Sequence, residues 1–221
     1  RSFRAARNGD FIRRGEEAAN ISGSVEAEGL VSDLEVRIYP QSKKVFVDKK
    51  LVRSSQTLIE LLPTIVFSPA DHRIIEGDSS DRKLFLNRAA ANVDWEYSED
   101  LSHFNKALLQ RNRVLKDASD HNWTLAIIQD LLAPWDDQLL TYGSRLIARR
   151  NFYLHDLLPW AREEYGKIAA SEDKFEFIYQ PIGEEEKIPC DTEGEIREIF
   201  AKKLQDSLRR DLASKSTQVG P

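Results

Sequence analysis

The first third of the chain alternates apolar and polar residues in the manner of β-strands. Apolar side chains recur at every second position in three stretches, at residues 21–25, 34–38 and 45–47. That period is typical of half-buried antiparallel strands. A turn is expected at residues 40–43, Pro-Gln-Ser-Lys. A fourth strand is predicted at residues 64–67, because an apolar run before Ser-Pro is typical of a strand covered on both faces.

From about residue 71 to residue 170 the apolar positions follow a helical period. Asp78, Ser79 or Ser80 is expected to cap the first helix. The helix expected at residues 123–132 should end near Pro134. Pro159 should kink or break the helix expected at 139–165, because proline removes a helical hydrogen bond. The expected later elements are helices at 95–116, 123–132 and 139–165, a strand at 175–179 and a helix at 193–215.

Strands therefore come first, helices occupy the middle, and a short strand and a helix return at the end. This order predicts an α+β fold in which a helical lobe is inserted into a small strand-rich part. We expect the strand-rich part at residues 1–70, the helical lobe at 71–170 and a return segment at 171–221.

Composition narrows the class of protein. With 221 residues, 41% hydrophobic and 31% charged, the chain is typical of a globular protein with one large or two small domains. A net charge of -5 argues against a surface wholly devoted to nucleic acid, although it leaves room for a local basic strip. The single cysteine, Cys190, suits a reducing cytoplasm. No run approaches the roughly 20 apolar residues of a membrane span, and no signal peptide is recognisable.

The sequence offers no catalytic or metal-binding motif. It contains no G-x-x-x-x-G-K-[ST] loop to cradle phosphates. The run before Asp130 resembles an apolar strand ending in a carboxylate, but its neighbours favour a core helix. The histidines are scattered, and Cys190 has no histidine near it in sequence. We therefore predict no catalytic residue and no metal site.

Arg111 is the most unusual basic residue. It falls inside the apolar stripe of its helix, whereas Lys106 and Arg113 fall on the opposite face. An unpaired buried charge costs several kcal/mol, so the guanidinium must find carboxylates or carbonyls. One interpretation is a salt bridge between helices. The other is an interface arginine that faces DNA or a protein partner.

Arg82 and Lys83 lie in the first turn of their helix, where the macrodipole disfavours cations. A phosphate or an acidic partner would explain them, and so would simple solvation. Arg145, Arg149 and Arg150 lie about one turn apart and form either a basic edge or a solvated face.

Several motifs, in order, resemble those of the RecF family. The run LPTIVFSPAD at residues 62–71, followed by Gly77, resembles that family's apolar strand, Ser-Pro-x-Asp and glycine. RKLFLN at 82–87 resembles Arg-Arg-x-Phe-Leu-Asp, and LQRN at 109–112 resembles a helix ending in Gln-Arg-Asn. SFR at 2–4 resembles the segment after the Walker A helix, and STQVGP at 216–221 resembles the start of a motif that continues His-Arg-Asp-Asp.

The resemblance implies part of an ABC- or SMC-type ATPase, with a strand-rich piece of the nucleotide-binding lobe and an inserted helical lobe. RecF proteins dimerise around ATP on DNA and act with RecO and RecR at single-strand gaps, helping RecA to load. ATP and Mg²⁺ are accordingly expected in the intact parent, and the chain is expected to be an internal fragment that lacks Walker A, the signature and Walker B. Alone it should bind no nucleotide and hydrolyse none.

By the same resemblance, Arg4 would contact nucleotide phosphates, although a structural ion pair at a strand start is an equal alternative. The residues expected to contact DNA or a partner are Arg82, Lys83, Arg111, Arg113 and Lys116. Two positions depart from the family pattern, since Asn87 replaces an aspartate and Lys83 an arginine, which reduces a bidentate grip to a point charge. A protein-interaction module that docks RecR or a second copy, and an unrelated α+β enzyme, remain alternatives.

Overall fold

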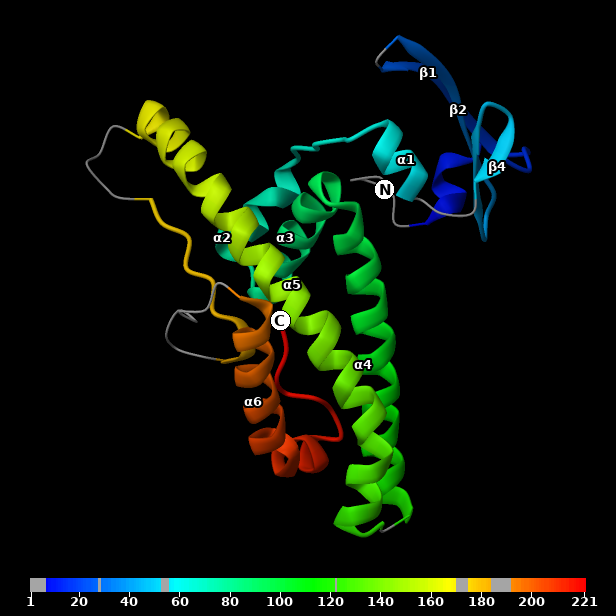
Figure 1. The fold of residues 1–221 in the computed structure, drawn as a ribbon. Coiled ribbons are helices and arrows are strands. Elements are labelled where there is room, and N and C mark those ends of the chain that lie inside the picture. The colour runs from blue at the N-terminus through cyan, green and yellow to red at the C-terminus, as the bar shows by residue number, and fades with distance from the viewer. Residues whose placement is uncertain (1–6, 28, 53–55, 122, 170–174, 184–191) are drawn as a thin grey trace. The chain divides into compact units, whose positions relative to one another are not determined.

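The computed structural model describes residues 7–27, 29–52, 56–121, 123–169, 175–183 and 192–221. The chain divides into two compact units, Arg1–Trp95 and Glu96–Pro221. The first contains the sheet and short helices, and the second contains the long helices (Figure 1). The combination of an antiparallel sheet with helices confirms the α+β fold class.

The sheet of the first unit is an antiparallel meander in the order β1-β2-β3-β4. Its strands are β1 (Ala19–Ala27), β2 (Leu30–Ile38), β3 (Lys43–Val47) and β4 (Lys50–Val52). The three alternating stretches of the sequence are therefore strands, and the turn predicted at 40–43 joins β2 to β3. Leu34 and Ile38 are buried on one face, as the period of two requires.

A tight hairpin connects β3 to β4, a strand that the sequence pattern did not predict. Asp48 and Lys49 adopt positive φ angles of 49° and 65°. Two consecutive positive φ values are typical of the two-residue turn whose twist matches that of paired strands. The Asp48 carboxylate accepts a hydrogen bond of 2.9 Å from the Asp33 amide and fixes the turn.

The rest of the first unit is helical: α1 (Gln56–Leu61), α2 (Arg73–Glu76) and α3 (Ser79–Val93). Asp78 caps α3, because its carboxylate accepts from the amides of Ser80 at 2.7 Å and Asp81 at 3.3 Å. The hydrogen bond from the Ser80 hydroxyl, followed by these two amide bonds, lowers the pKa of Asp78. The predicted capping is thus confirmed, with Asp78 as the residue that does it.

The strand predicted at residues 64–67 is wrong. These residues pair with no strand among the described residues, and Ile65 and Phe67 expose 94% and 90% of their surface. A strand needs a neighbour for its backbone hydrogen bonds, and an apolar run cannot supply one. The segment ends where the Ser68 amide donates to the Asp71 carboxylate at the start of a 3-10 turn.

The second unit is organised by α4 (Trp95–His121), α5 (Leu125–Ile168) and α6 (Glu193–Ser214). Figure 1 shows α4 and α5 running side by side as a hairpin, with α6 beside α5. Leu115 and Ala118 of α4 pack on Ile128 and Leu132 of α5 to form a core near the hairpin's closed end. The helices predicted at 95–116 and 193–215 are confirmed.

One helix, α5, replaces the two helices predicted at 123–132 and 139–165. It continues through Pro134 and is not broken at Pro159. An interior proline costs roughly 3 kcal/mol. Leu132 and Leu139, on either side of Pro134, are buried to 1% and 0% exposure, so packing on both sides offsets that cost.

The strand predicted at residues 175–179 is also wrong. The segment forms no ladder within the described part of the chain and packs on the end of α5 instead. Tyr165 and Phe175 stack with ring centroids 5.3 Å apart, and Arg162 Nε donates to the Phe175 carbonyl at 3.0 Å. The alternating pattern therefore reflects a half-buried extended segment on a helix.

Candidate functional site

A buried arginine joins the three long helices. Arg111 lies on α4 with 1% of its side chain exposed. Its Nε donates to Asp136 of α5 at 2.6 Å, and one terminal nitrogen donates to Asp211 of α6 at 2.7 Å. The same nitrogen donates to the Thr217 hydroxyl at 2.8 Å. The structure therefore confirms the interpretation that Arg111 forms salt bridges between helices.

The segment that follows α6 is bound to this network; we call residues 215–221 the strap. The Thr217 amide and hydroxyl donate to the Asn112 side-chain oxygen at 2.8 and 2.7 Å. The Gln218 amide donates to Asp211 at 3.0 Å. Farther along, the Gly220 carbonyl accepts from the Ile182 amide at 3.2 Å. The strap thus lies against α4 and reaches the segment before α6.

The electrostatics of the network are uneven. Burial raises the pKa of Asp136, and the charge of Asp211 adds to the rise, while Arg111 opposes it. Asp211 is completely buried and also accepts from the Ser207 hydroxyl at 3.1 Å. Two carboxylates thus share one guanidinium, and the arrangement depends on Arg111 for its charge balance.

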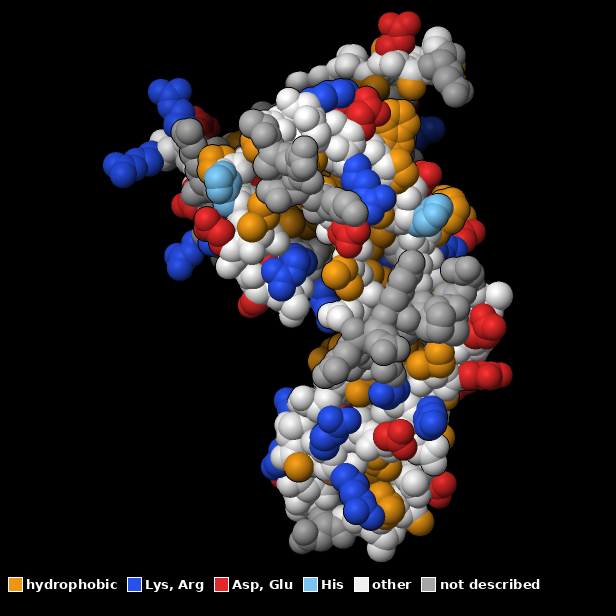
Figure 2. All heavy atoms as spheres, turned by 90° about the vertical axis from the view of Figure 1, so that its left-hand side faces the viewer, with side chains coloured by type: hydrophobic (Ala, Val, Ile, Leu, Met, Phe, Trp, Pro, Cys, Tyr) orange, Lys and Arg blue, Asp and Glu red, His pale blue; other side chains and the backbone are white. Residues whose placement is uncertain are grey.

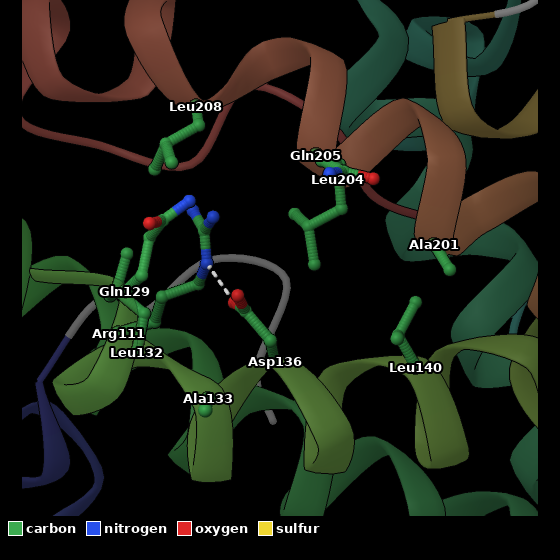
Figure 3. Close-up of a pocket in the computed structure, with 10 residues that line it drawn as sticks. All are labelled: Arg111, Gln129, Leu132, Ala133, Asp136, Leu140, Ala201, Leu204, Gln205 and Leu208. Atoms are coloured by element: carbon green, nitrogen blue, oxygen red, sulfur yellow. Dashed lines mark hydrogen bonds and ion pairs between the residues drawn. The ribbon is translucent and has the colours of Figure 1, made fainter. Parts of the chain in front are cut away.

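A groove of about 260 Å³ opens beside this network. Figure 3 shows Arg111 and Asp136 pointing toward each other, with Leu132, Ala133 and Leu140 of α5 facing Ala201, Leu204 and Leu208 of α6. Gln129 and Gln205 complete the lining. Apolar walls with a few polar groups suit an apolar side chain better than a phosphate.

A second charged cluster lies farther along α4 and α5. Arg145 and Arg149 approach the Asp100 carboxylate at 3.6 and 3.7 Å and also pair with Glu193 and Glu96. One Asp100 oxygen is buried without a hydrogen-bond partner. Burial raises the pKa of Asp100, against the pull of Arg149 and Arg145, and Glu96 adds to the rise.

Arg150 completes the basic group that the sequence placed on α5. It is buried to 2% exposure, and its guanidinium donates to the hydroxyls of Tyr97 at 2.7 Å and Tyr179 at 3.1 Å. Burial works to lower the pKa of Arg150, but the two tyrosines outweigh it and the pKa lies above its ordinary value. The three arginines thus bind groups of this chain.

The other predicted contact residues lie on the surface. Arg113 on α4 is 77% exposed, with Asp117 one turn away at 4.0 Å, and Lys116 is exposed on the same helix. Arg82 and Lys83 are exposed on α3, where the Arg82 guanidinium donates to the Gly77 carbonyl at 2.9 Å. Arg4 lies outside the described residues. Only Arg111 belongs to the buried network, and its enclosure gives no support to a direct contact with DNA.

The sequence missed most of the network's members. Asp136, Asp211 and Thr217 carried no predicted role, although Asn112 and the strap belong to the motifs quoted for their resemblance to RecF.

Basic and acidic side chains are interspersed on the face drawn in Figure 2. Among the described residues, no group of three or more His, Cys, Asp or Glu side chains is placed to hold a metal. No described helix combines the length and apolarity that a bilayer crossing needs.

Comparison with known proteins identifies the relatives. RecF of Natranaerobius thermophilus is 30% identical over the whole chain, and RecF of Chlamydia abortus is 31% identical. A solved structure of the recombination mediator RecF with ATPrS in the RecFOR pathway is 31% identical, with a TM-score of 0.87 over the whole chain. The chain is RecF-like along its entire length. No family model matches it.

The chain covers only part of the length of the RecF proteins that it matches. The chain spans 58% of the Natranaerobius protein, 57% of the Chlamydia protein and 58% of the solved chain. A second solved structure, of RecF with ATP, has the same TM-score of 0.87 at 30% identity. The shared fold therefore includes both the antiparallel sheet and the helical unit.

Proposed function

We propose that this chain is part of a RecF-like, ATP-dependent protein of DNA replication and repair. The observation that carries the proposal is the match to RecF over the whole chain at about 30% identity, with a TM-score of 0.87 to structures described as RecF with ATP or ATPrS. In the proposed parent, ATP with Mg²⁺ supports a homodimer on DNA. The parent acts at single-strand gaps with RecO and RecR and helps RecA to load.

The division of labour within the chain is part of the proposal. Residues 1–70 are assigned to the nucleotide-binding lobe, residues 71–170 to the helical lobe, and residues 171–221 to a return segment. The compact units of the structure divide at Trp95 instead, with α6 and the strap in the second unit. The chain has no Walker A loop, so phosphate binding in the parent depends on other residues, with Arg4 as a further contact.

We assign DNA contact to the outward face of α4. Lys106, Arg113 and Lys116 are exposed and lie on one stripe at spacings of seven and three residues. Cations along one face neutralise successive phosphates and release counterions. Arg82 and Lys83 on α3 belong to the first unit and are proposed as separate contacts. Arg111 is left out of this surface because it is enclosed by carboxylates of its own chain.

The test is charge reversal in the full-length protein that contains this chain. Arg113→Glu with Lys116→Glu should lower affinity for a gapped duplex by roughly tenfold or more and reduce the slope of log affinity against log salt by about 2. Lys202→Glu on α6, also exposed, is the matched control and should leave both unchanged. Fluorescence anisotropy across a salt series measures both quantities.

A second candidate is a protein-interaction module that docks RecR or a second copy. It is favoured by the net charge of -5, by the groove between α5 and α6, and by exposed apolar residues on α5. Ile127 and Leu131, one turn apart on α5, are 46% and 40% exposed. If charge reversal leaves DNA affinity unchanged while Leu131→Ser weakens binding of purified RecR, this candidate replaces DNA contact as the role of the helical unit.

A further inference from the structure

The strap is held mainly by polar contacts. Asn112 accepts twice from Thr217, and Asp211 accepts from the Gln218 amide through its side chain and from the Ser216 amide through its carbonyl. Val219, at 9% exposure, and Pro221 are its buried apolar residues. Each such hydrogen bond is individually weak, because the same groups bond to water when they are released. Releasing residues 216–218 breaks a small set of hydrogen bonds and leaves the apolar core between α4 and α5 intact.

The bend into the strap opposes this binding. Lys215 caps α6 with a φ of 55°, in the left-handed region that disfavours residues with a Cβ. The bend turns the chain back from α6, so that Ser216 donates to the Asp211 carbonyl at 3.1 Å. The docked strap therefore combines favourable hydrogen bonds with an unfavourable backbone, which brings the docked and released states closer in free energy.

The same stretch of α4 carries the strap contacts and the proposed DNA contacts. Arg111 and Asn112 bind the strap, while Arg113 and Lys116 extend to solvent. Successive residues of a helix are separated by about 100°, so neighbours in sequence project to different sides of one rigid cylinder. The strap contacts and the proposed DNA contacts therefore lie on the same two turns of α4.

We infer that Arg111, Asn112 and Asp211 form a latch for the strap, and that DNA bound to the outer face of α4 favours the docked strap. Arg111 and Asn112 are positioning residues in this scheme, since they act through the strap. The DNA half of the inference rests on the proposed function. Coupling between two sites is reciprocal, so a released strap also weakens DNA binding by the same factor.

Hydrogen exchange of the full-length protein tests the latch. Thr217→Val keeps the shape of the side chain but removes the hydroxyl that accepts from Arg111 and donates to Asn112. Protection of the Thr217 and Gln218 amides should fall about tenfold, the equivalent of about 1.4 kcal/mol. Thr217→Ser retains the hydroxyl, so amide protection at residues 217 and 218 should stay within about twofold of that in the unsubstituted protein. Asn112→Ala provides an independent route to the same loss.

The second measurement adds a gapped duplex to the unsubstituted protein. Saturating DNA should raise protection of the same two amides by about threefold or more. Thr217→Val should weaken DNA binding by no more than the same factor, because it shifts the strap toward release without releasing it completely. Bound DNA with unchanged strap protection overturns the inference and leaves the proposed function standing. Unchanged protection in both Thr217→Val and Asn112→Ala overturns the latch itself. If charge reversal at Arg113 and Lys116 leaves DNA affinity unchanged, the DNA assignment is wrong, and the coupling is wrong with it.

Discussion

The helical unit buries two arginines in different ways. Arg111 and Arg150 are 1% and 2% exposed. Arg111 is held by the carboxylates of Asp136 and Asp211, whereas Arg150 donates to the hydroxyls of Tyr97 and Tyr179. One site therefore confines three charges, whereas the two described hydrogen bonds of Arg150 go to neutral hydroxyls.

The difference determines what each site loses when its arginine is removed. A buried ion pair is expensive to break, because the remaining charge stays desolvated and unbalanced. A neutral hydroxyl that loses its donor costs only the desolvation of a polar group. Two residues of the same type and burial should thus differ clearly in their contribution to stability.

Arg111→Met should give the largest effect. It leaves Asp136 and Asp211 without their shared cation, and the free energy of unfolding should fall by about 3–5 kcal/mol. Urea titration followed by tryptophan fluorescence measures this loss. Arg113→Met on the same helix is the control and should change stability by less than about 0.5 kcal/mol, since that side chain is 77% exposed. Adding Asp136→Asn and Asp211→Asn to Arg111→Met should recover part of the loss, and no recovery would contradict the charge-balance explanation.

Arg150→Met should cost less, about 1–3 kcal/mol, because it leaves the hydroxyls of Tyr97 and Tyr179 without this donor. The control is Tyr97→Phe with Tyr179→Phe, which removes the hydroxyls in advance. Adding Arg150→Met to that background measures the coupling between the arginine and its two acceptors. A loss for Arg150→Met equal to that for Arg111→Met would show that the chemistry of the partner does not matter.

The fold was predictable where the pattern is local. Alternation with a period of two located β1, β2 and β3. Residue type narrowed the cap of α3 to Asp78, Ser79 or Ser80, and the structure identifies Asp78. Residues 64–67 and 175–179 have strand-like composition but form no ladder in the described structure, since pairing depends on a partner strand. Continuation of α5 through Pro134 depends on packing that a local rule does not contain.

The candidate site was predictable in kind but not in its members. The position of Arg111 in an apolar stripe indicated that it needs an anionic partner. Its partners lie 25 residues away at Asp136 and 100 residues away at Asp211, so no spacing in the sequence reveals them. Asn112 differs in that a motif pointed to it, although nothing in the motif indicated that it binds the strap.

Asp100 should give the smallest effect. Like Asp211 it is a buried carboxylate near arginines, but its ion pairs are longer than those of Arg111. It is buried near Arg145 and Arg149, yet burial dominates and its pKa is raised. A raised pKa means that the folded protein binds this proton more readily than the unfolded chain does. The charged form therefore costs stability above the folded-state pKa, and that cost disappears as the pH falls below the unfolded value.

Asp100→Asn imitates the protonated carboxyl and should raise the melting temperature at neutral pH by a few degrees or less. The advantage should shrink as the pH is lowered through the folded-state pKa, because the unsubstituted carboxyl then becomes neutral as well. Thermal unfolding at several pH values measures the difference, with Asp130→Asn as the exposed control on α5. A lower melting temperature for Asp100→Asn at neutral pH would mean that the ion pairs with Arg145 and Arg149 outweigh the burial of Asp100, which would make this site resemble that of Arg111.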